Sequence, residues 1–509
     1  MRHILIIGIT LWMSLHAAAQ SFTVSCNGES VPLYEQNDVP ASYKLSSYKY
    51  ARLVYSGEPL NVSITADFSV VANDWDIAPY SYQIQGNLSD KTISFTIDRT
   101  GYVVVRFKKG QDFTRRVVLF IEEPEIMPDG DFVNLSSYCV DNTGQYNETK
   151  RIQKALDDAA DAGKVVYFPD GTYKVSLLRI PSNSRVHLSK GCRLLADPED
   201  FESFQNNDNT GTNRFIYIKD AENIQITGLG TFDGNGTYFR GVFDPNGSNG
   251  IGAMRVLFIV NSKNITFDGI LLKDAARWNT QIVGCQDITF RNCKMLNNPN
   301  TNANLTNFDG WDPDASQRVL IENCFGWAGD DNVAVKCVGT GSPKVIQDVE
   351  DITIRGCVFL SKKSSLKIGT ETRCNNMKNI TFENNDVIEA DRVIAIEVQD
   401  NAIVDGVLYK NNRSDYNYPD AQKRGIYFNL TERNAGQGYL GKILNVRIED
   451  CTFNSVFPNK FRIYRDPAMT VIGDLQVTIK NLRVAGNIVN NLTTNYFDTA
   501  NCNGVIVFE

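Results

Sequence analysis

Three aspartates in two short segments are the residues best suited to acid–base chemistry in this chain. Asp309 lies in Asn307-Phe-Asp-Gly-Trp-Asp-Pro-Asp314, and Asp330 and Asp331 lie in Gly329-Asp-Asp-Asn-Val-Ala-Val-Lys336. Carboxylates held close together repel one another, and this repulsion raises the pKa of at least one of them. The protonated group can act as a general acid while an ionised neighbour activates water, a division of labour that suits inverting hydrolysis of a glycosidic bond.

Two other interpretations of these aspartates stay open. Asp and Asn are common turn residues, so an Asp-Asp pair can be purely structural. Clustered carboxylates also bind hard cations such as calcium, but the spacing here matches no calcium-binding loop. We therefore predict a site without a metal and without a cofactor.

Histidine is too scarce to support most other catalytic chemistry. The chain has three histidines, His3, His16 and His187, and the first two lie in a segment that reads as an export signal. Serine–histidine triads, cysteine–histidine dyads and multi-histidine metal sites are therefore disfavoured.

A short pattern of alternating apolar and polar residues recurs between residues 223 and 451. Two copies are Asn264-Ile-Thr-Phe-Asp-Gly269 and Asp351-Ile-Thr-Ile-Arg-Gly-Cys357. Successive copies begin 41, 23, 31, 33, 28 and 66 residues apart, and the last interval covers two copies. A repeat of this length, with one short strand in each copy, is typical of a parallel β-helix. We predict an all-β chain whose main part is a right-handed parallel β-helix.

The repeat length also places the three aspartates near one another. Asp309 precedes Asp330 by 21 residues and Asp331 by 22, which is about one coil. Because strands of adjacent coils lie about 4.8 Å apart, we expect the three carboxylates on one face of the solenoid.

Other segments precede the solenoid. Residues 1–19 read as a secretion signal, with a basic start, an apolar run and a small-residue end. Residues 20–123 contain short alternating strands separated by turn residues, which predicts a small N-terminal β-sandwich. A linker at 124–131 leads to the β-helix domain at 132–509, where a helix after Ile152 is expected to cover the first coil.

Composition restricts the partners and the compartment. A net charge of −8 disfavours nucleic acid as a partner. No apolar stretch after the signal is long enough to span a membrane, so we expect an exported protein, periplasmic or extracellular. Four of the eleven cysteines occupy one slot of the repeat, which predicts stacked free thiols; they are Cys293, Cys324, Cys357 and Cys451.

At the acidic segments the sequence resembles glycoside hydrolase family 28, the polygalacturonases, and the related dextranases and isopullulanases of family 49. The family patterns Asn-Thr-Asp-Gly-x-Asp-Pro and Gly-Asp-Asp-x-x-Ala-x-Lys appear at 307–313, with Phe308 for threonine, and at 329–336. The resemblance, over roughly 132–454, implies that Asp330 is the general acid and that Asp309 and Asp331 position and deprotonate water. The sandwich resembles the family 49 arrangement.

Two departures from the family pattern concern the substrate. Polygalacturonases carry Gly-His-Gly where this chain has Lys363-Ser-Ser365, and their Arg-Ile-Lys aligns with Ala395-Ile-Glu397. In the family the second motif grips a galacturonate carboxylate, so the loss of two cations and the gain of an anion should repel a uronate. The sequence therefore predicts a neutral or differently decorated polysaccharide.

Four further residues are candidate substrate contacts. Trp311 could stack on a sugar face or fill the core. Lys336 could touch substrate or act as the counter-ion that keeps Asp331 ionised. Lys367 and Arg392 could reach the same face of the solenoid.

The function expected from these features is that of a secreted glycoside hydrolase acting on a polysaccharide or oligosaccharide. One alternative is a polysaccharide lyase on the same fold, which needs a cation and an Arg or Lys base and gives a product that absorbs ultraviolet light. The other is a non-catalytic carbohydrate-binding solenoid.

Overall fold

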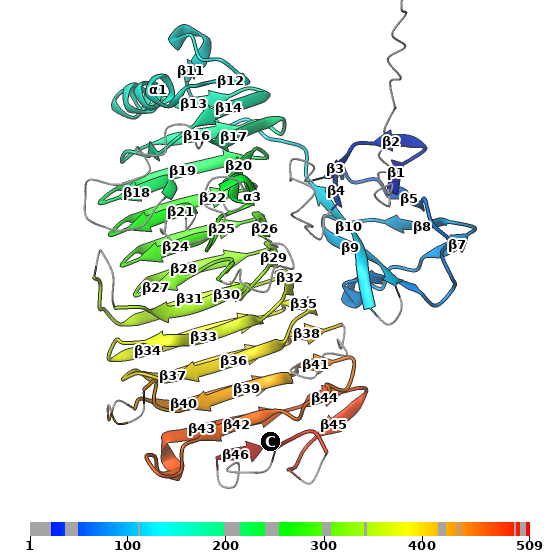
Figure 1. Cartoon of the computed structure of the whole chain (residues 1–509), viewed down its shortest axis with the longest axis vertical. Helices are drawn as coiled ribbons and strands as arrows, with labels where there is room; N and C mark the ends of the chain where they lie inside the picture. Colours follow the sequence, from blue (N-terminus) through cyan, green and yellow to red (C-terminus); the bar gives the residue numbers. More distant parts are fainter. Residues whose placement is uncertain are drawn as a thin grey trace, which may run out of the picture.

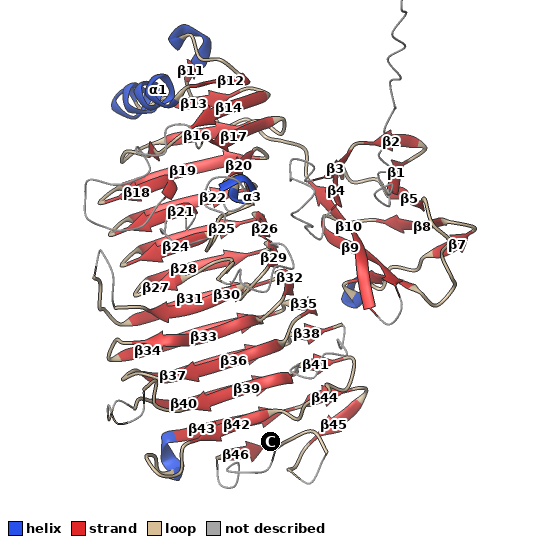
Figure 2. Cartoon of the chain, in the orientation of Figure 1, coloured by secondary structure: helices blue, strands red, loops and turns tan. Residues whose placement is uncertain are grey.

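A computed structural model describes residues 22–35, 49–109, 112–197, 214–239, 254–297, 307–339, 344–415, 424–434, 436, 438, 440–492, 495–498 and 505–509. The segment predicted to be a signal, residues 1–19, lies outside the described residues. Strands dominate, and they build a small sandwich beside a long solenoid (Figure 1, Figure 2). No helix in the described ranges is long and apolar enough to cross a membrane.

The small sandwich contains two five-stranded sheets, ordered β2-β1-β5-β8-β7 and β3-β4-β10-β9-β6. Their facing sides bury alternate residues, among them Val62 and Ile64 on β5 and Val103 and Val105 on β9. The strands are β1 (Phe22–Cys26), β2 (Glu29–Val31), β3 (Leu33–Glu35), β4 (Lys49–Val54), β5 (Leu60–Ala66), β6 (Trp75–Ala78), β7 (Asn87–Ser89), β8 (Thr92–Ile97), β9 (Gly101–Lys109) and β10 (Asp112–Glu122), with a 3-10 turn at Tyr80–Tyr82.

The solenoid is a right-handed parallel β-helix with three long sheets, as the sequence predicts. Most coils add one strand to each sheet in a fixed order. The first sheet contains β11 (Phe132–Asn134), β13 (Val165–Phe168), β16 (Arg185–Leu188), β19 (Glu222–Gly228), β22 (Lys263–Asp268), β25 (Gln286–Arg291), β28 (Gln317–Glu322), β31 (Val349–Arg355), β34 (Asn376–Glu383), β37 (Ile403–Lys410), β40 (Lys442–Glu449), β43 (Leu475–Lys480) and β46 (Ile506–Phe508).

The other two sheets carry the surfaces that matter for function. The second sheet contains β12 (Thr143–Asn147), β14 (Gly171–Val175), β17 (Cys192–Ala196), β20 (Thr231–Asp233), β23 (Leu271–Lys273), β26 (Lys294–Asn297), β29 (Phe325–Ala328), β32 (Val358–Ser361), β35 (Asp386–Glu389), β38 (Arg413–Ser414), β41 (Thr452–Phe453), β44 (Leu482–Val484) and β45 (Asn487–Val489). The third contains β15 (Leu178–Arg179), β18 (Arg214–Lys219), β21 (Arg255–Val260), β24 (Thr280–Val283), β27 (Pro313–Asp314), β30 (Val333–Cys337), β33 (Ser364–Thr372), β36 (Arg392–Val398), β39 (Arg424–Leu430) and β42 (Arg462–Arg465).

Like residues stack from coil to coil inside the solenoid. Phe267 lies on Phe290 with ring centroids 4.7 Å apart, a spacing set by the parallel strand pairing. The predicted thiol stack is confirmed, since Cys293, Cys324 and Cys357 are buried and free. Where the slot changes to asparagine, the Oδ1 of Asn385 accepts the Cys357 N–H at 3.0 Å. The repeat therefore fixes the register of every coil.

Helix α1 (Thr149–Ala162) covers the open end of the first coils, as predicted (Figure 1). Its buried stripe includes Ile152 and Leu156, and Gly163, with φ of 66°, ends the helix. A single short turn of helix, α3 (Gly236–Tyr238), lies after β20, and a 3-10 turn at Ile472–Asp474 precedes β43.

The sandwich packs its β3-β4-β10-β9-β6 sheet against the second sheet of the solenoid. Tyr102 and Phe120 of the sandwich meet Phe325 on β29, with ring centroids 5.5 and 5.4 Å away. Buried charges reinforce this contact, because Glu122 binds both Arg52 of the sandwich and Lys294 of the solenoid. Such a desolvated apolar and ionic contact holds the two parts in one arrangement.

Candidate active site

The three aspartates lie in turns that lead from the second sheet to the third. Asp309 follows β26 and precedes β27, and Asp330 and Asp331 connect β29 to β30. The two turns pair in parallel, because the Gly310 N–H donates to the Asp331 carbonyl at 2.8 Å and the Trp311 N–H donates to the Asn332 carbonyl at 2.9 Å. Neighbouring coils therefore bring the acids together, as their spacing predicts.

Lys336 on β30 forms ion pairs with the turn that comes first in the chain, the one with Asp309. Its Nζ lies 2.7 Å from Asp309 Oδ2 and 3.2 Å from Asp312 Oδ1, and all three side chains are buried. Burial, together with the charge of Asp331, raises the pKa of Asp309, and burial raises the pKa of Asp312 still further above its ordinary range. Lys336 is expected from the sequence to hold Asp331 ionised or to touch substrate; its charge does lower the pKa of Asp331, but its direct ion pairs are with Asp309 and Asp312 of the preceding coil.

Lys367 on β33 is the residue that holds Asp331. Its Nζ lies 2.9 Å from Asp331 Oδ2, and the Ser364 N–H donates to Asp331 Oδ1 at 2.8 Å. Burial opposes ionisation of Asp331, but Lys367 and Lys336 together bring the pKa of Asp331 below its ordinary value. Asp331 is therefore the carboxylate of this cluster that stays ionised.

Asp330 has the opposite environment. No lysine or arginine of the described residues contacts its carboxylate, which accepts one hydrogen bond of 2.9 Å from the Asn307 N–H. Burial, followed by the charges of Asp309 and Asp331, raises the pKa of Asp330 to about 7. Asp330 is only partly buried, so its carboxyl group can hand a proton to a molecule at the surface.

Arg392 and Lys367 both contact Glu397 on β36. Glu397 Oε1 lies 2.8 Å from Arg392 Nη1 and 3.3 Å from Lys367 Nζ. The sequence argument for a neutral substrate treats Glu397 as a free anion, and that premise is wrong because two cations neutralise it. Arg392 lies only partly buried over Tyr427, 5.1 Å from the ring centroid, so it reaches the outer face of the third sheet.

Trp311 is a correction to the predicted substrate contacts. Its side chain is 0% exposed and lies between Phe290 and Phe359, with ring centroids 6.3 and 6.4 Å away. Its strand position turns the indole into the solenoid, where it fills the core beneath the acids. It cannot stack on a sugar ring.

Trp278 is the indole that lies beside the acids. It is half-buried, and Lys336 Nζ sits 3.9 Å from its ring centroid. The Arg255 guanidinium also lies over the Trp278 ring, 4.9 Å from its centroid. The sequence carries only a weak signal for these two residues, because Arg255 stands 54 positions before Asp309 and no motif marks it.

Arg255 is a partly buried cation that lacks a direct ion pair within the described residues. Burial, and then the nearby charge of Arg277, lower the pKa of Arg255 to about 10. Its Nε atom is buried without a hydrogen-bond partner among those residues. A bound anion would offset the cost of removing this cation from water without a partner.

A metal fits this site poorly. Lys336 and Lys367 already occupy the carboxylate oxygens that a hard cation would need. In the described ranges no group of three or more His, Cys, Asp or Glu residues is arranged to hold a metal ion.

A family model described as glycosyl hydrolases family 28 matches residues 177–457, which is more than half of the chain. The chain belongs to this family. The matched region of this family 28 chain includes Asp309, Asp330 and Asp331 and the lysines that pair with them.

Curated relatives are similar over part of their length. The probable endo-xylogalacturonan hydrolase A of Aspergillus fumigatus is 27% identical over 257 residues, covering 49% of this chain and 59% of that protein. The probable exopolygalacturonase X of Neosartorya fischeri is 25% identical over 205 residues, covering 39% and 46%. The family 28 chain thus spans about half of the length of these relatives.

Solved structures share the fold. Dex49A from Penicillium minioluteum matches with a TM-score of 0.62 at 14% identity and covers 96% of this chain and 94% of that chain. The exopolygalacturonase from Thermotoga maritima matches with a TM-score of 0.58 at 18% identity and covers 71% and 89%. The N-terminal sandwich of this family 28 member is therefore like that of Dex49A.

Replacing Trp311 with alanine tests its position in the core. Trp311→Ala should lower the free energy of unfolding by about 3–5 kcal/mol, because it leaves a cavity between two phenylalanines. Chemical denaturation measures this change. Trp278→Ala is the matched control and should cost clearly less, since that indole is half-buried; equal losses for the two variants would contradict the assignment.

Proposed function

We propose that this family 28 protein is an inverting glycosidase that hydrolyses an acidic polysaccharide. The observation that carries the proposal is that the pKa values of two adjacent aspartates are shifted in opposite directions. The pKa of Asp330 is raised to about 7, whereas Lys367 and Lys336 lower the pKa of Asp331. An acid and a base of different strength, side by side, are what hydrolysis of a glycosidic bond requires.

In the proposed reaction Asp330 donates its proton to the glycosidic oxygen as the bond to the anomeric carbon breaks. A water molecule attacks the opposite face of that carbon, and Asp331 accepts the proton that this water loses. Asp309 orients the same water. Lys336 and Lys367 are positioning residues, because each holds one carboxylate through an ion pair of 2.7 or 2.9 Å.

The acidic character of the substrate is supported by cations on both sides of the aspartates. Arg255 precedes them along the third sheet and Arg392 follows them. Each lies over an aromatic ring, Trp278 and Tyr427 respectively, a combination that suits a sugar ring carrying a carboxylate. The names of two relatives, a probable endo-xylogalacturonan hydrolase and a probable exopolygalacturonase, agree with a uronate polymer.

We also propose that the protein is exported. Residues 1–19 have the basic start, apolar run and small-residue end of a secretion signal. An acidic polysaccharide of this kind is a polymer met outside the cytoplasm, where such an enzyme would act. We therefore propose a periplasmic or extracellular location.

Replacing Asp330 with asparagine removes the proposed general acid. Asp330→Asn should lower kcat on polygalacturonate by about 10²–10⁴-fold while substrate binding persists, because the amide keeps the size but has no proton to give. Reducing-end assays measure kcat. Asp351→Asn, an exposed aspartate on the first sheet, is the matched control and should keep full activity.

The products of the same assay separate hydrolysis from the alternatives. Hydrolysis gives no new ultraviolet absorption, and NMR of the first product should show an inverted anomeric centre. An ultraviolet-absorbing product would identify a lyase, and full activity of Asp330→Asn would remove Asp330 from the mechanism.

The pH profile of kcat/KM tests the two protonation states. Activity should fall as pH rises through about 7, because Asp330 must be protonated. On the acid side activity should persist below the ordinary pKa of aspartate, because Asp331 must be ionised and its pKa is lowered. Lys367→Met should move this acid limb to higher pH, whereas Lys410→Met, an exposed lysine on the first sheet, should not. An unmoved acid limb would contradict the pairing.

Replacing Arg255 with leucine tests the charge of the substrate. Arg255→Leu should lower kcat/KM on unesterified polygalacturonate by about tenfold or more, because a charge-assisted hydrogen bond contributes roughly 1.5–3 kcal/mol. The loss should be much smaller on the fully methyl-esterified polymer. Arg318→Leu, an exposed arginine on the first sheet, is the control. Faster cleavage of neutral polysaccharides than of polygalacturonate by the unmodified protein would contradict the acidic assignment.

A further inference from the structure

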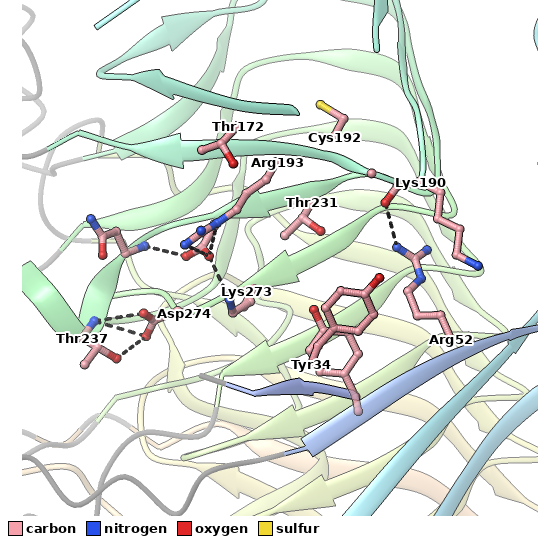
Figure 3. Close-up of a pocket in the computed structure, with 14 residues that line it drawn as sticks. Tyr34, Arg52, Thr172, Lys190, Cys192, Arg193, Thr231, Thr237, Lys273 and Asp274 are labelled. Carbon is pink, nitrogen blue, oxygen red and sulfur yellow. Dashed lines mark hydrogen bonds and ion pairs between the residues drawn. The ribbon is translucent and has the colours of Figure 1, made fainter. Parts of the chain in front are cut away.

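A second pocket lies where the sandwich meets the early coils of the solenoid (Figure 3). Its volume is about 280 Å³, at the small end of the range of ligand pockets, which is roughly 300–1,000 Å³. Tyr34 and Arg52 come from the sandwich, and Arg193, Thr231 and Lys273 come from the second sheet of the solenoid. The pocket therefore exists only because the two parts are docked together.

Cations outnumber anions in this pocket. Arg52, Lys190, Arg193 and Lys273 line it, against the two carboxylates Asp233 and Asp274. The surplus is unexpected in a chain whose net charge is −8. Because like charges repel in a confined space, a local excess of cations favours an anionic occupant.

The ion pairs that exist in the pocket do not use up its cations. Arg193 and Lys273 share one oxygen, Asp233 Oδ2, at 2.9 Å each. Arg52 shares Glu122 with Lys294, which lies behind the pocket wall. Lys190 forms no direct ion pair with a described residue, and burial followed by the charge of Arg52 lowers its pKa. Asp233 and Glu122 thus each pair with two cations, whereas Asp274 accepts hydrogen bonds from Thr237.

The pocket also has an aromatic wall and threonine hydroxyl groups. Tyr34 and Tyr50 stack with ring centroids 5.1 Å apart and an interplanar angle of 19°. Tyr34 is 44% exposed, so one ring is available to a ligand. Figure 3 shows Thr231 between the Arg193–Lys273 side and Arg52, with Tyr34 along the adjoining wall. An exposed ring, hydroxyl groups and cations together match a sugar ring that carries a carboxylate.

We propose that this pocket is a second, non-catalytic binding site for one uronate unit of an acidic polysaccharide. The carboxylate meets Arg193 and Lys273, and the sugar ring lies against Tyr34. Binding here holds a polymer close to the aspartates and raises its effective concentration there. The choice of uronate rests on the proposed function, whereas the pocket, its charges and its aromatic wall do not.

Binding of trigalacturonate to the Asp330→Asn protein tests the proposal, because this protein cannot consume the ligand. Calorimetry should show two binding events. The double variant Tyr34→Ala, Arg193→Gln should weaken one of them about tenfold or more, and Arg255→Leu should weaken only the other. Lys273 still pairs with Asp233 in the double variant, so the fold is retained.

The matched control is Tyr146→Ala, Arg318→Gln, which removes an exposed tyrosine and an ion-paired arginine elsewhere on the solenoid. Neither binding event should change in this control. In the otherwise unmodified protein, Tyr34→Ala, Arg193→Gln should keep kcat on trigalacturonate but lower retention on an immobilised polygalacturonate column several-fold.

Four outcomes would overturn the proposal. They are a single binding event in the Asp330→Asn protein, equal binding by the Tyr34→Ala, Arg193→Gln variant, equally tight binding of a neutral galactose trisaccharide at the pocket, and binding of inorganic sulfate as tight as that of galacturonate. Failure of the proposed function is separate, since it appears as absent hydrolysis while pocket binding is still measured. Hydrolysis together with only one binding event would contradict the pocket proposal but not the proposed function.

Discussion

Parallel backbone pairing between consecutive coils is the constraint on which the site depends. The hydrogen bonds from Gly310 and Trp311 to the Asp331 and Asn332 carbonyls force two acidic turns to lie one coil apart. Such proximity would separate free carboxylates by repulsion. The many pairing interactions of the solenoid hold the acids in place, so burial, and then repulsion between the carboxylates, raise the pKa values of Asp309 and Asp330.

Cations from each following coil offset the acids of the coil before. Lys336 on β30 pairs with Asp309 in the preceding turn, and Lys367 on β33 pairs with Asp331. Arg392 and Glu397 on β36 continue the same chain of charges. Asp330 is left outside this pattern, so burial and then the charges of Asp309 and Asp331 raise its pKa to about 7, whereas the two lysines lower the pKa of Asp331.

The pocket beside the sandwich and the cluster of three aspartates both lie at the ends of second-sheet strands. Asp233 and Lys273 stand at the ends of β20 and β23, as the turns that carry Asp309, Asp330 and Asp331 follow β26 and β29. Strand ends of the second sheet thus present charged groups in several coils. At the early coils the sandwich adds Tyr34 and Arg52 and forms a pocket, whereas at β29 it packs against Phe325 and the turn with Asp330 and Asp331 follows that strand.

The sequence by itself determined the solenoid, the sandwich and the grouping of the three aspartates, because period and alternation depend on local pattern and coil length. It also marked Lys367 and Arg392, although not their shared partner Glu397. Only the tertiary structure decided that Trp311 faces inward, that Lys336 forms its ion pair with Asp309 rather than with Asp331, and that Arg255 of an earlier coil lies beside the site. Side-chain direction and ion pairing depend on which coil lies next to which, and on burial that no single repeat contains. The same holds for the pocket beneath the sandwich, whose two halves are 120 residues or more apart in the chain, counted from Arg52 to Thr172.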